Sequence, residues 1–341
     1  MYMITRRAFG LIGAAAVAAF AVPASAQDVI TLKVADSYNP NHYISVNGTV
    51  PWMKRVEELA GGKVKFEYFP AEQLGKMADL PSLMKAGVAD IVLIPTGVFA
   101  ADYPLTSVAT LPGFGTSSTE TSLAYWDIVS KDGPVREEYA SKGFRPLVYF
   151  CTPQHEIVSR TEMASLDDLK GLKVRATAGV PSQIISAIGA SPVQVSPPEM
   201  YTSIERGTID GAFVPYPSAR GYKLDEVIKS ATHNAALGSI VTGYSTTEAT
   251  WAKLPDEVKA AFEQANREFL ERITAFQDDA TSKDKQFLEE KGIKLLTIDA
   301  SMKSALDAAV APIVGGWVSE MEGKGLKGQE VLDAWTAALT K

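Results

Sequence analysis

The most informative segment of this chain begins with SLDDLKGLKVR (residues 165–175) and ends with GTIDGAFVPYP (207–217). A polar turn and a short helix lead through Gly171 into a short strand at 172–174, which ends at Arg175. Ligands of open α/β sheets gather beyond the carboxyl ends of the strands, and an arginine presents a planar fork of donors suited to a carboxylate or phosphate. We therefore expect Arg175 to hold the anionic group of a small ligand. A salt bridge on the surface or between domains is the alternative.

The residues before this segment predict the opening of a doubly wound sheet. Strands are expected at 31–35, 64–69 and 90–94, and helical apolar spacing separates them. The third strand is apolar on both faces, as a buried parallel strand should be. Loops that follow such strands face one cleft, so they supply three further candidate ligand contacts: Tyr38, His42 and Thr96.

The rest of the chain continues to alternate strands and helices, which indicates an α/β fold. Further strands are expected at 145–150, 156–159, 193–195, 209–214 and 293–298. Helices are expected at about 118–130, 134–142, 181–188 and 198–206, from Pro255 to about 291, and twice more before the C-terminus. No Pro/Gly/Ser-rich linker separates two halves, so the chain is expected to cross between two hinged lobes several times.

Aromatic and imidazole side chains near the later strand ends are further candidates for the cleft. Phe213 and Tyr216 lie at and just after the strand at 209–214, although packing in the core is the alternative for both, as it is for Tyr38. His155 lies beside Glu156 on the segment that enters the second lobe. A histidine with only structural hydrogen bonds is the alternative there.

Composition excludes several classes of function. The 341 residues are 46% hydrophobic and 21% charged, as in a globular protein, and the net charge is −7. Nucleic acid is not expected as a partner, because counterion release needs a basic face. Cys151 is the only cysteine, so no intramolecular disulfide can form and a cysteine zinc site is excluded. We expect it to be a buried strand residue.

The N-terminus has the pattern of an export signal at residues 1–26. Arg6 and Arg7 precede an apolar run at 11–22 that is shorter than the about 20 residues of a bilayer span, and small residues follow at 24–26. We expect a periplasmic protein exported by the twin-arginine route. The general secretory route and a retained N-terminal anchor are the alternatives.

Motifs of catalysis are missing from the sequence. The three histidines lack metal-ligand spacing, and neither a Gly-x-Ser-x-Gly elbow nor a phosphate-binding glycine loop occurs. We therefore expect no enzyme, no cofactor and no metal site. An enzyme that uses His155 and Glu156 as acid and base is the alternative from another class of function.

Several segments together resemble the solute-binding proteins of tripartite ATP-independent periplasmic (TRAP) transporters, in their dicarboxylate-binding branch. The resemblance covers residues 28 to about 275 and rests most on these segments: FPAEQLG (69–75), KAGVAD (85–90), DLKGLKVR (168–175), IGASPV (188–193), GTIDG (207–211) and WAKLP (251–255).

This resemblance implies two α/β lobes of the periplasmic-binding-protein type, each with a mixed sheet, joined by a long helix around a buried ligand. The expected lobes are 28–151 with about 240–279, and 152–239 with about 280–341. It also implies delivery of the ligand to membrane permease subunits, and that Arg175 pairs with the ligand carboxylate. We expect a monomer, with His155 or Thr96 adding a hydrogen bond to the ligand.

Two positions depart from the family pattern and bear on the ligand. His155 stands where many members have a second arginine, and Val214 stands where many have an asparagine that touches the carboxylate. Burying an unpaired polar group of a ligand costs about 1–3 kcal/mol, so a monocarboxylate with an apolar or aromatic body is favoured. A C4-dicarboxylate or a sugar acid is the alternative ligand, and a sensor partner is an alternative recipient.

Overall fold

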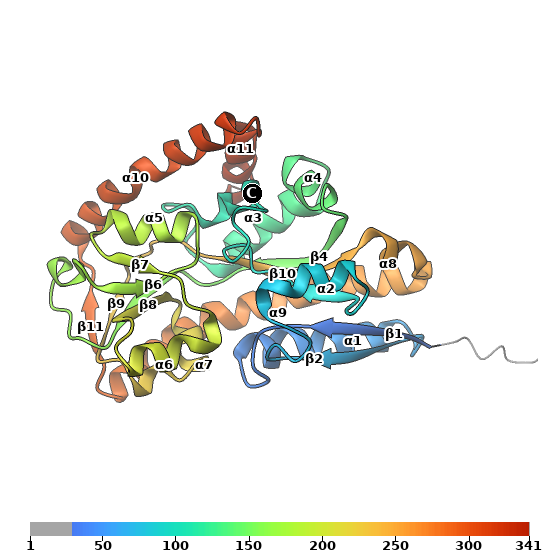
Figure 1. Ribbon diagram of the computed structural model, residues 1–341, viewed down its shortest axis with the longest axis horizontal. Coiled ribbons are helices and arrows are strands. Elements are labelled where there is room, and N and C mark those ends of the chain that lie inside the picture. The colour runs from blue at the N-terminus through green and yellow to red at the C-terminus, as the bar shows by residue number, and fades with distance from the viewer. Residues whose placement is uncertain (1–28, 341) are drawn as a thin grey trace, which may run out of the picture.

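The computed structural model describes residues 29–340, and the export signal expected at 1–26 lies outside them. Two β-sheets lie side by side, and helices cover their faces (Figure 1). We call the five-stranded sheet with its helices the first lobe, and the six-stranded sheet with its helices the second lobe. This mixed α/β architecture confirms the predicted fold class.

The sheet of the first lobe has the strand order β2-β1-β3-β10-β4. Its strands are β1 (Ile30–Ala35), β2 (Val64–Phe69), β3 (Ile91–Leu93), β4 (Phe144–Cys151) and β10 (Val241–Thr247). The first three strands are parallel, as their separation by helices predicts, and β10 pairs antiparallel with both β3 and β4. β10 was not predicted, because its polar residues do not alternate with apolar ones. In the structure both of its faces are nevertheless buried.

The sheet of the second lobe has the strand order β11-β9-β5-β8-β6-β7. Its strands are β5 (Glu156–Ser159), β6 (Lys173–Arg175), β7 (Ser191–Val193), β8 (Gly211–Val214), β9 (Ser230–His233) and β11 (Lys294–Thr297). β6 lies between β7 and β8 and is parallel to both. β7 begins two residues before the predicted strand at 193–195, and β9 was not predicted.

Helices cover the sheets and connect the strands. They are α1 (Val50–Leu59), α2 (Leu80–Lys85), α3 (Ser118–Ser130), α4 (Pro134–Ala140), α5 (Val180–Ala187), α6 (Met200–Glu205), α7 (Tyr216–Gly221), α8 (Glu248–Lys253), α9 (Asp256–Glu290), α10 (Ala300–Gly323) and α11 (Gly328–Leu339). Short 3₁₀ or π turns are η1 (Ser45–Thr49), η2 (Met77–Asp79), η3 (Leu105–Thr110), η4 (Leu166–Leu169), η5 (Pro197–Glu199) and η6 (Leu224–Glu226). Across residues 29–340, no helix is both long and apolar enough to cross a bilayer.

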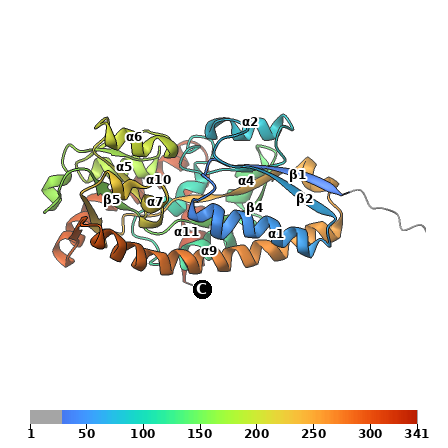
Figure 2. The same cartoon turned by 90° about the horizontal axis from the view of Figure 1, so that it is seen from below.

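The chain passes between the lobes at 152–155, at 234–240, along α9 and again from α10 to α11. With 35 residues α9 is about 50 Å long, and it runs beneath both lobes (Figure 2). Its first half is tied to the first lobe, because Asn266 accepts a hydrogen bond from Trp52 at 2.8 Å and donates one to the carbonyl of Leu147 at 2.6 Å. Its second half packs against α7 and β11 of the second lobe.

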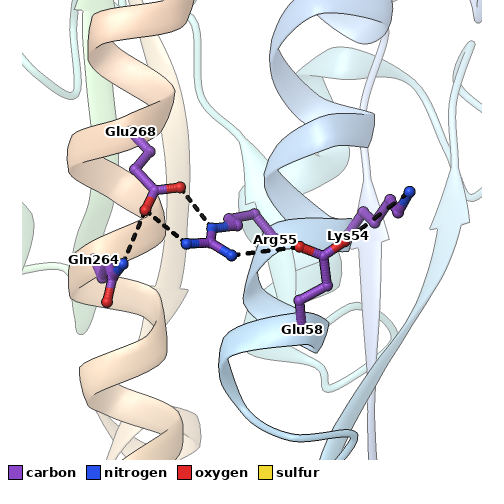
Figure 3. A network of polar contacts seen from close by, with 5 residues as sticks. All are labelled: Lys54, Arg55, Glu58, Gln264 and Glu268. Atoms are coloured by element: carbon purple, nitrogen blue, oxygen red, sulfur yellow. Dashed lines mark hydrogen bonds and ion pairs between the residues drawn. The ribbon is translucent and has the colours of Figure 1, made fainter.

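A polar network on the surface also fixes α1 on α9 (Figure 3). Arg55 donates from Nε to one carboxylate oxygen of Glu268 at 2.6 Å and from a terminal nitrogen to the other at 3.1 Å. The hydrogen bond from Arg55 lowers the pKa of Glu268 to about 2. Solvent screens such exposed pairs, so the network orients the two helices more than it stabilises the fold.

The two C-terminal helices return from the second lobe to the first. α10 packs against α5, whereas α11 packs against α3 through buried Val331 and Trp335. The sequence-based division placed all of 280–341 in the second lobe. α11 instead packs on α3 and η3 of the first lobe.

Cys151 lies at the end of β4 and is fully buried, as predicted. Its thiol lies 3.5 Å from the carbonyl oxygen of Thr121, and burial raises the pKa of the thiol to about 12. A thiol that stays protonated in this way is unreactive as a nucleophile.

Candidate ligand-binding site

Arg175 is the last residue of β6 and is only 5% exposed. Its Nε donates a hydrogen bond to the carbonyl of Val195 at 3.0 Å. Across residues 29–340 its two terminal nitrogens have no hydrogen bond, and no acid lies within ion-pair distance of the guanidinium. Burial lowers the pKa of the guanidinium, but an arginine keeps its charge in proteins. Arg175 is therefore a buried cation that lacks an anionic partner in the described chain.

Two connected hollows meet at Arg175, between the lobes. The inner chamber has a volume of about 60 Å³, and the outer pocket has one of about 300 Å³. Residues of both lobes line the inner chamber: Tyr38, Met77, Pro95, Val98, Thr152, His155, Arg175, Thr177, Pro197, Met200, Val214, Pro215, Ser218, Tyr222, Ile240 and Thr242. Arg175 is the only Arg, Lys, Asp or Glu among them. Five of these residues also line the outer pocket: Met77, Val98, Arg175, Thr177 and Pro197.

His155 lines the inner chamber from the segment that crosses between the lobes, and it is 2% exposed. Its Nδ1 lies 3.1 Å from the carbonyl oxygen of Pro153, and its ring packs on Phe213 with the ring centres 4.8 Å apart. Burial lowers the pKa of His155 to about 3; the hydrogen bond to Pro153 opposes this shift, and the charge of Arg175 adds to it. The imidazole is thus neutral at physiological pH.

Tyr38 and Val214 line the same chamber from opposite lobes. The hydroxyl of Tyr38 lies 3.4 Å from Oγ1 of Thr242, and its backbone N–H donates to the buried carboxylate of Asp36. Its ring stacks on His42, with the ring centres 4.5 Å apart. These contacts fix the position of the phenol. Of the eight candidates named from the sequence, the structure therefore brings four together around one cavity: Tyr38, His155, Arg175 and Val214.

The other four candidates lie behind the lining. His42 supports Tyr38, and its Nδ1 accepts from the backbone N–H of Ile44 at 3.3 Å. Phe213 lies behind His155. The hydroxyls of the remaining two already donate within the protein: Thr96 to the carbonyl of Val241 at 3.0 Å, and Tyr216 to that of Thr232 at 2.5 Å.

Sequence reasoning missed several polar residues of the lining: Thr152, Thr177, Ser218, Tyr222 and Thr242. Thr152 belongs to a crossing segment, and Thr242 to the unpredicted strand β10. Tyr222 lies just after α7, where no strand end points to it. A prediction of the crossings at 152–155 and 234–240 would have identified Thr152.

Two glycines allow the lobes to touch on either side of the chamber. A Cβ atom at Gly97 of the first lobe would lie 2.5 Å from Oγ1 of Thr177 in the second lobe. A Cβ atom at Gly221 of the second lobe would lie 2.8 Å from the ring of His42 in the first. Both separations are shorter than van der Waals contact, so only glycine permits this approach. The lobes are therefore closed around the inner chamber.

Glu156 follows His155 but faces the second lobe instead of the chamber. Its carboxylate accepts a hydrogen bond from Thr232 at 2.5 Å and one from the backbone N–H of Ala235 at 3.2 Å. Burial raises the pKa of Glu156 to about 7. Within residues 29–340, no three His, Cys, Asp or Glu side chains are grouped to hold a metal ion.

The raised pKa of Glu156 predicts a loss of stability as the pH rises from about 4.5 to just above 7. A raised carboxyl pKa contributes stability that is complete below the unfolded value, 4.5, and is lost as the pH rises through about 7. We expect the free energy of unfolding to fall by about 1 kcal/mol between pH 6.5 and 8, and to fall less in Glu156→Gln. Urea denaturation at several pH values measures this slope. The exposed control Glu205→Gln should keep the wild-type slope; an unchanged slope in Glu156→Gln would contradict the assignment.

Comparison with known proteins identifies the family. The model of bacterial extracellular solute-binding protein family 7 matches residues 35–320. A solute-binding protein of Roseobacter denitrificans is 28% identical over 317 residues, which cover 89% of this chain and 93% of that protein. A Comamonas testosteroni protein named as the outer membrane transporter TsaT is 26% identical and covers 95% of this chain and 96% of its own.

Solved structures agree in fold. A TRAP solute-binding protein of Rhodoferax ferrireducens, in complex with copurified benzoate, has a TM-score of 0.85 and is 24% identical. The alignment covers 92% of this chain and 98% of that one. A Bordetella bronchiseptica TRAP protein with bound mandelate has a TM-score of 0.83 at 23% identity, over 91% and 99% of the two chains. Since the family model matches most of the chain, this protein belongs to family 7 of the bacterial extracellular solute-binding proteins, the solute-binding proteins of TRAP transporters.

Proposed function

We propose that this TRAP solute-binding protein captures a small monocarboxylate with an apolar or aromatic body, and that Arg175 pairs with the carboxylate. The observation that carries the proposal is the buried guanidinium of Arg175, which faces a cavity and has no acid partner in the described chain. A buried charge without a partner costs several kcal/mol. A ligand carboxylate offsets that cost and matches the planar fork of the arginine.

A single negative charge fits the chamber better than two. The lining offers one charged side chain, Arg175, while His155 is neutral and Val214 is apolar. The only other Lys or Arg in the linings of the two hollows is Lys76 in the outer pocket, which already pairs with Glu72 at 3.0 Å. A second carboxylate would be buried without a partner, which costs more than a neutral polar group does.

The ligands of structural relatives support a ligand whose body is aromatic or similarly compact. The Rhodoferax ferrireducens protein contains benzoate, the Bordetella bronchiseptica protein contains mandelate, and a marine metagenome protein is described as specific for aromatic acid ligands. Methionine, valine and proline side chains at the junction of the two hollows provide apolar surface for such a body in this chain.

TRAP solute-binding proteins deliver their ligand to membrane permease subunits, and we propose that this chain does so as a periplasmic monomer exported by the twin-arginine route. We also propose that it is not an enzyme. In support, Glu156 bonds to Thr232 and Ala235 and does not line the chamber, so it and His155 do not form an acid–base pair there.

A thermal-shift screen of mono- and dicarboxylates tests the ligand class. Benzoate, phenylacetate and mandelate are expected to raise the melting temperature, since a ligand at 100 times its Kd stabilises by about 2.7 kcal/mol. Succinate and malate are expected to have little effect. Stabilisation by the dicarboxylates alone would contradict the monocarboxylate proposal, and mass spectrometry of the purified protein identifies any ligand carried through.

A further inference from the structure

The hydrogen bond of His155 determines which of its ring nitrogens carries the proton. Nδ1 lies 3.1 Å from the carbonyl oxygen of Pro153. The hydroxyl of Thr152 lies 3.5 Å from the same nitrogen and can accept or donate, whereas a carbonyl oxygen only accepts. The shorter contact with Pro153 therefore assigns the proton to Nδ1, which donates. A neutral imidazole has one N–H, and Nε2 is therefore left with a lone pair. His155 presents a hydrogen-bond acceptor at Nε2.

This acceptor opens onto the inner chamber. Nε2 of His155 has no hydrogen-bond partner in the part of the chain that the structure describes, and it is not among the fully enclosed atoms that lack partners. Since His155 lines the chamber, the accessible side of Nε2 is the chamber side. His42 is the contrasting case: its Nδ1 accepts from Ile44, and its Nε2 is fully enclosed.

Nothing around the ring favours a second proton. Burial and the nearby cation of Arg175 both lower the pKa of His155. A monocarboxylate neutralises Arg175 and leaves no excess negative charge for an imidazolium to balance. The other titratable side chains of the chamber lining are the phenols of Tyr38 and Tyr222, whose pKa values burial raises, so they are neutral as well.

The small volume of the chamber fixes how far apart the two ligand groups can be. At about 60 Å³ it is well below the about 300–1,000 Å³ of a typical ligand pocket. A carboxylate on Arg175 and a donor on His155 must therefore lie on neighbouring parts of one small molecule. The bulk of the ligand can extend into the outer pocket, which shares Arg175 with the chamber.

We propose that the ligand of this site is a hydroxy acid, whose carboxylate pairs with Arg175 and whose hydroxyl, on the adjacent carbon, donates to Nε2 of His155. This inference rests on the proposed function of the site. A parent acid without the hydroxyl leaves Nε2 unpaired in a buried place, and sites built to bind a hydroxyl discriminate strongly against analogues that lack it. His155 thus selects among monocarboxylates.

Calorimetry with matched acids tests the inference on the exported form of the chain at pH 7.5. The pairs are lactate with propionate and mandelate with phenylacetate, which differ only in the hydroxyl. We expect the hydroxy acid of at least one pair to bind about tenfold more tightly or better than its parent acid. In His155→Phe that preference should disappear, mainly through weaker binding of the hydroxy acid. The control His233→Asn, outside the lining, should keep it.

The outcomes separate the inference from the proposed function. Equal affinity within both pairs, or a preference that survives in His155→Phe, overturns the role of His155 while the monocarboxylate proposal stands. Binding of none of the four acids to the wild type overturns the proposed function, and the inference with it. Nitrogen NMR of the histidine rings needs no variant: a protonated Nε2 in the free protein would also overturn the inference.

Discussion

Replacing Arg175 by alanine is expected to weaken binding of the carboxylate ligand by about 3–5 kcal/mol, roughly two to four orders of magnitude in Kd. The reason is that the variant would bury a carboxylate with no cation to pair with it, since Arg175 is the only Arg, Lys, Asp or Glu of the chamber lining. Isothermal titration calorimetry with the best ligand of the thermal-shift screen measures the change.

The same substitution should not destabilise the protein without ligand. Arg175→Ala loses one hydrogen bond to Val195 but also removes a buried charge that has no partner in the described chain. We therefore expect an equal or higher melting temperature in ligand-free buffer, whereas loss of an internal salt bridge would lower it. Opposite effects on binding and stability distinguish a ligand clamp from a structural arginine.

Two further variants control this result. Arg175→Lys keeps a positive charge but lacks the planar fork, so it should bind more weakly than the wild type and more tightly than the alanine variant. Arg206→Ala removes an exposed arginine of the same lobe and should change nothing. Wild-type affinity in Arg175→Ala would show that the carboxylate binds elsewhere.

A methyl group at Gly97, a residue that does not itself line the inner chamber, is expected to weaken binding by about tenfold or more. In Gly97→Ala the new atom would overlap Thr177 of the other lobe, 2.5 Å away. Overpacking of this kind costs about 1–3 kcal/mol, and because the contact joins the two lobes, the overlap opposes the closed form. The apparent Kd rises in proportion as the closed form becomes less populated.

Stopped-flow kinetics and small-angle scattering check this prediction. The dissociation rate should increase, and the ligand-bound protein should remain more extended than the wild type. Gly316→Ala is the matched control, because a Cβ atom at this exposed position of α10 has no neighbour within 4 Å. An unchanged Kd in Gly97→Ala would show that closure does not bring Gly97 against Thr177.

Much of the backbone was predictable because strong local signals agree with the fold. Gly171 followed by the apolar residues Leu172 and Val174 predicted a strand at 172–174. The structure has this strand as β6, and Arg175 lies at its end. β10 escaped prediction because Thr242 and Ser245 are polar, yet both are buried beside neighbouring strands. The order of the strands places these residues inside, and no short window of sequence contains that information.

The candidate site was harder to predict than the fold, because a position after a strand fixes the backbone but not the direction of a side chain. Tyr38 and His42 come from the same loop, and only Tyr38 reaches the chamber. Thr96 follows β3, but its hydroxyl turns to the carbonyl of Val241 on the unpredicted strand β10. Arg175 needed no such detail, since it is the only buried arginine or lysine within residues 29–340.

Because the thiol of Cys151 is buried, a spectroscopic label can be attached selectively at a cysteine introduced elsewhere in the protein. Because this sole cysteine is enclosed and stays protonated, a maleimide dye should leave the wild type unmodified. A single cysteine introduced at Lys76, on the rim of the outer pocket, would then carry the only fluorophore. Its emission would report each opening and closing of the lobes in real time, with every native residue of the inner chamber left in place.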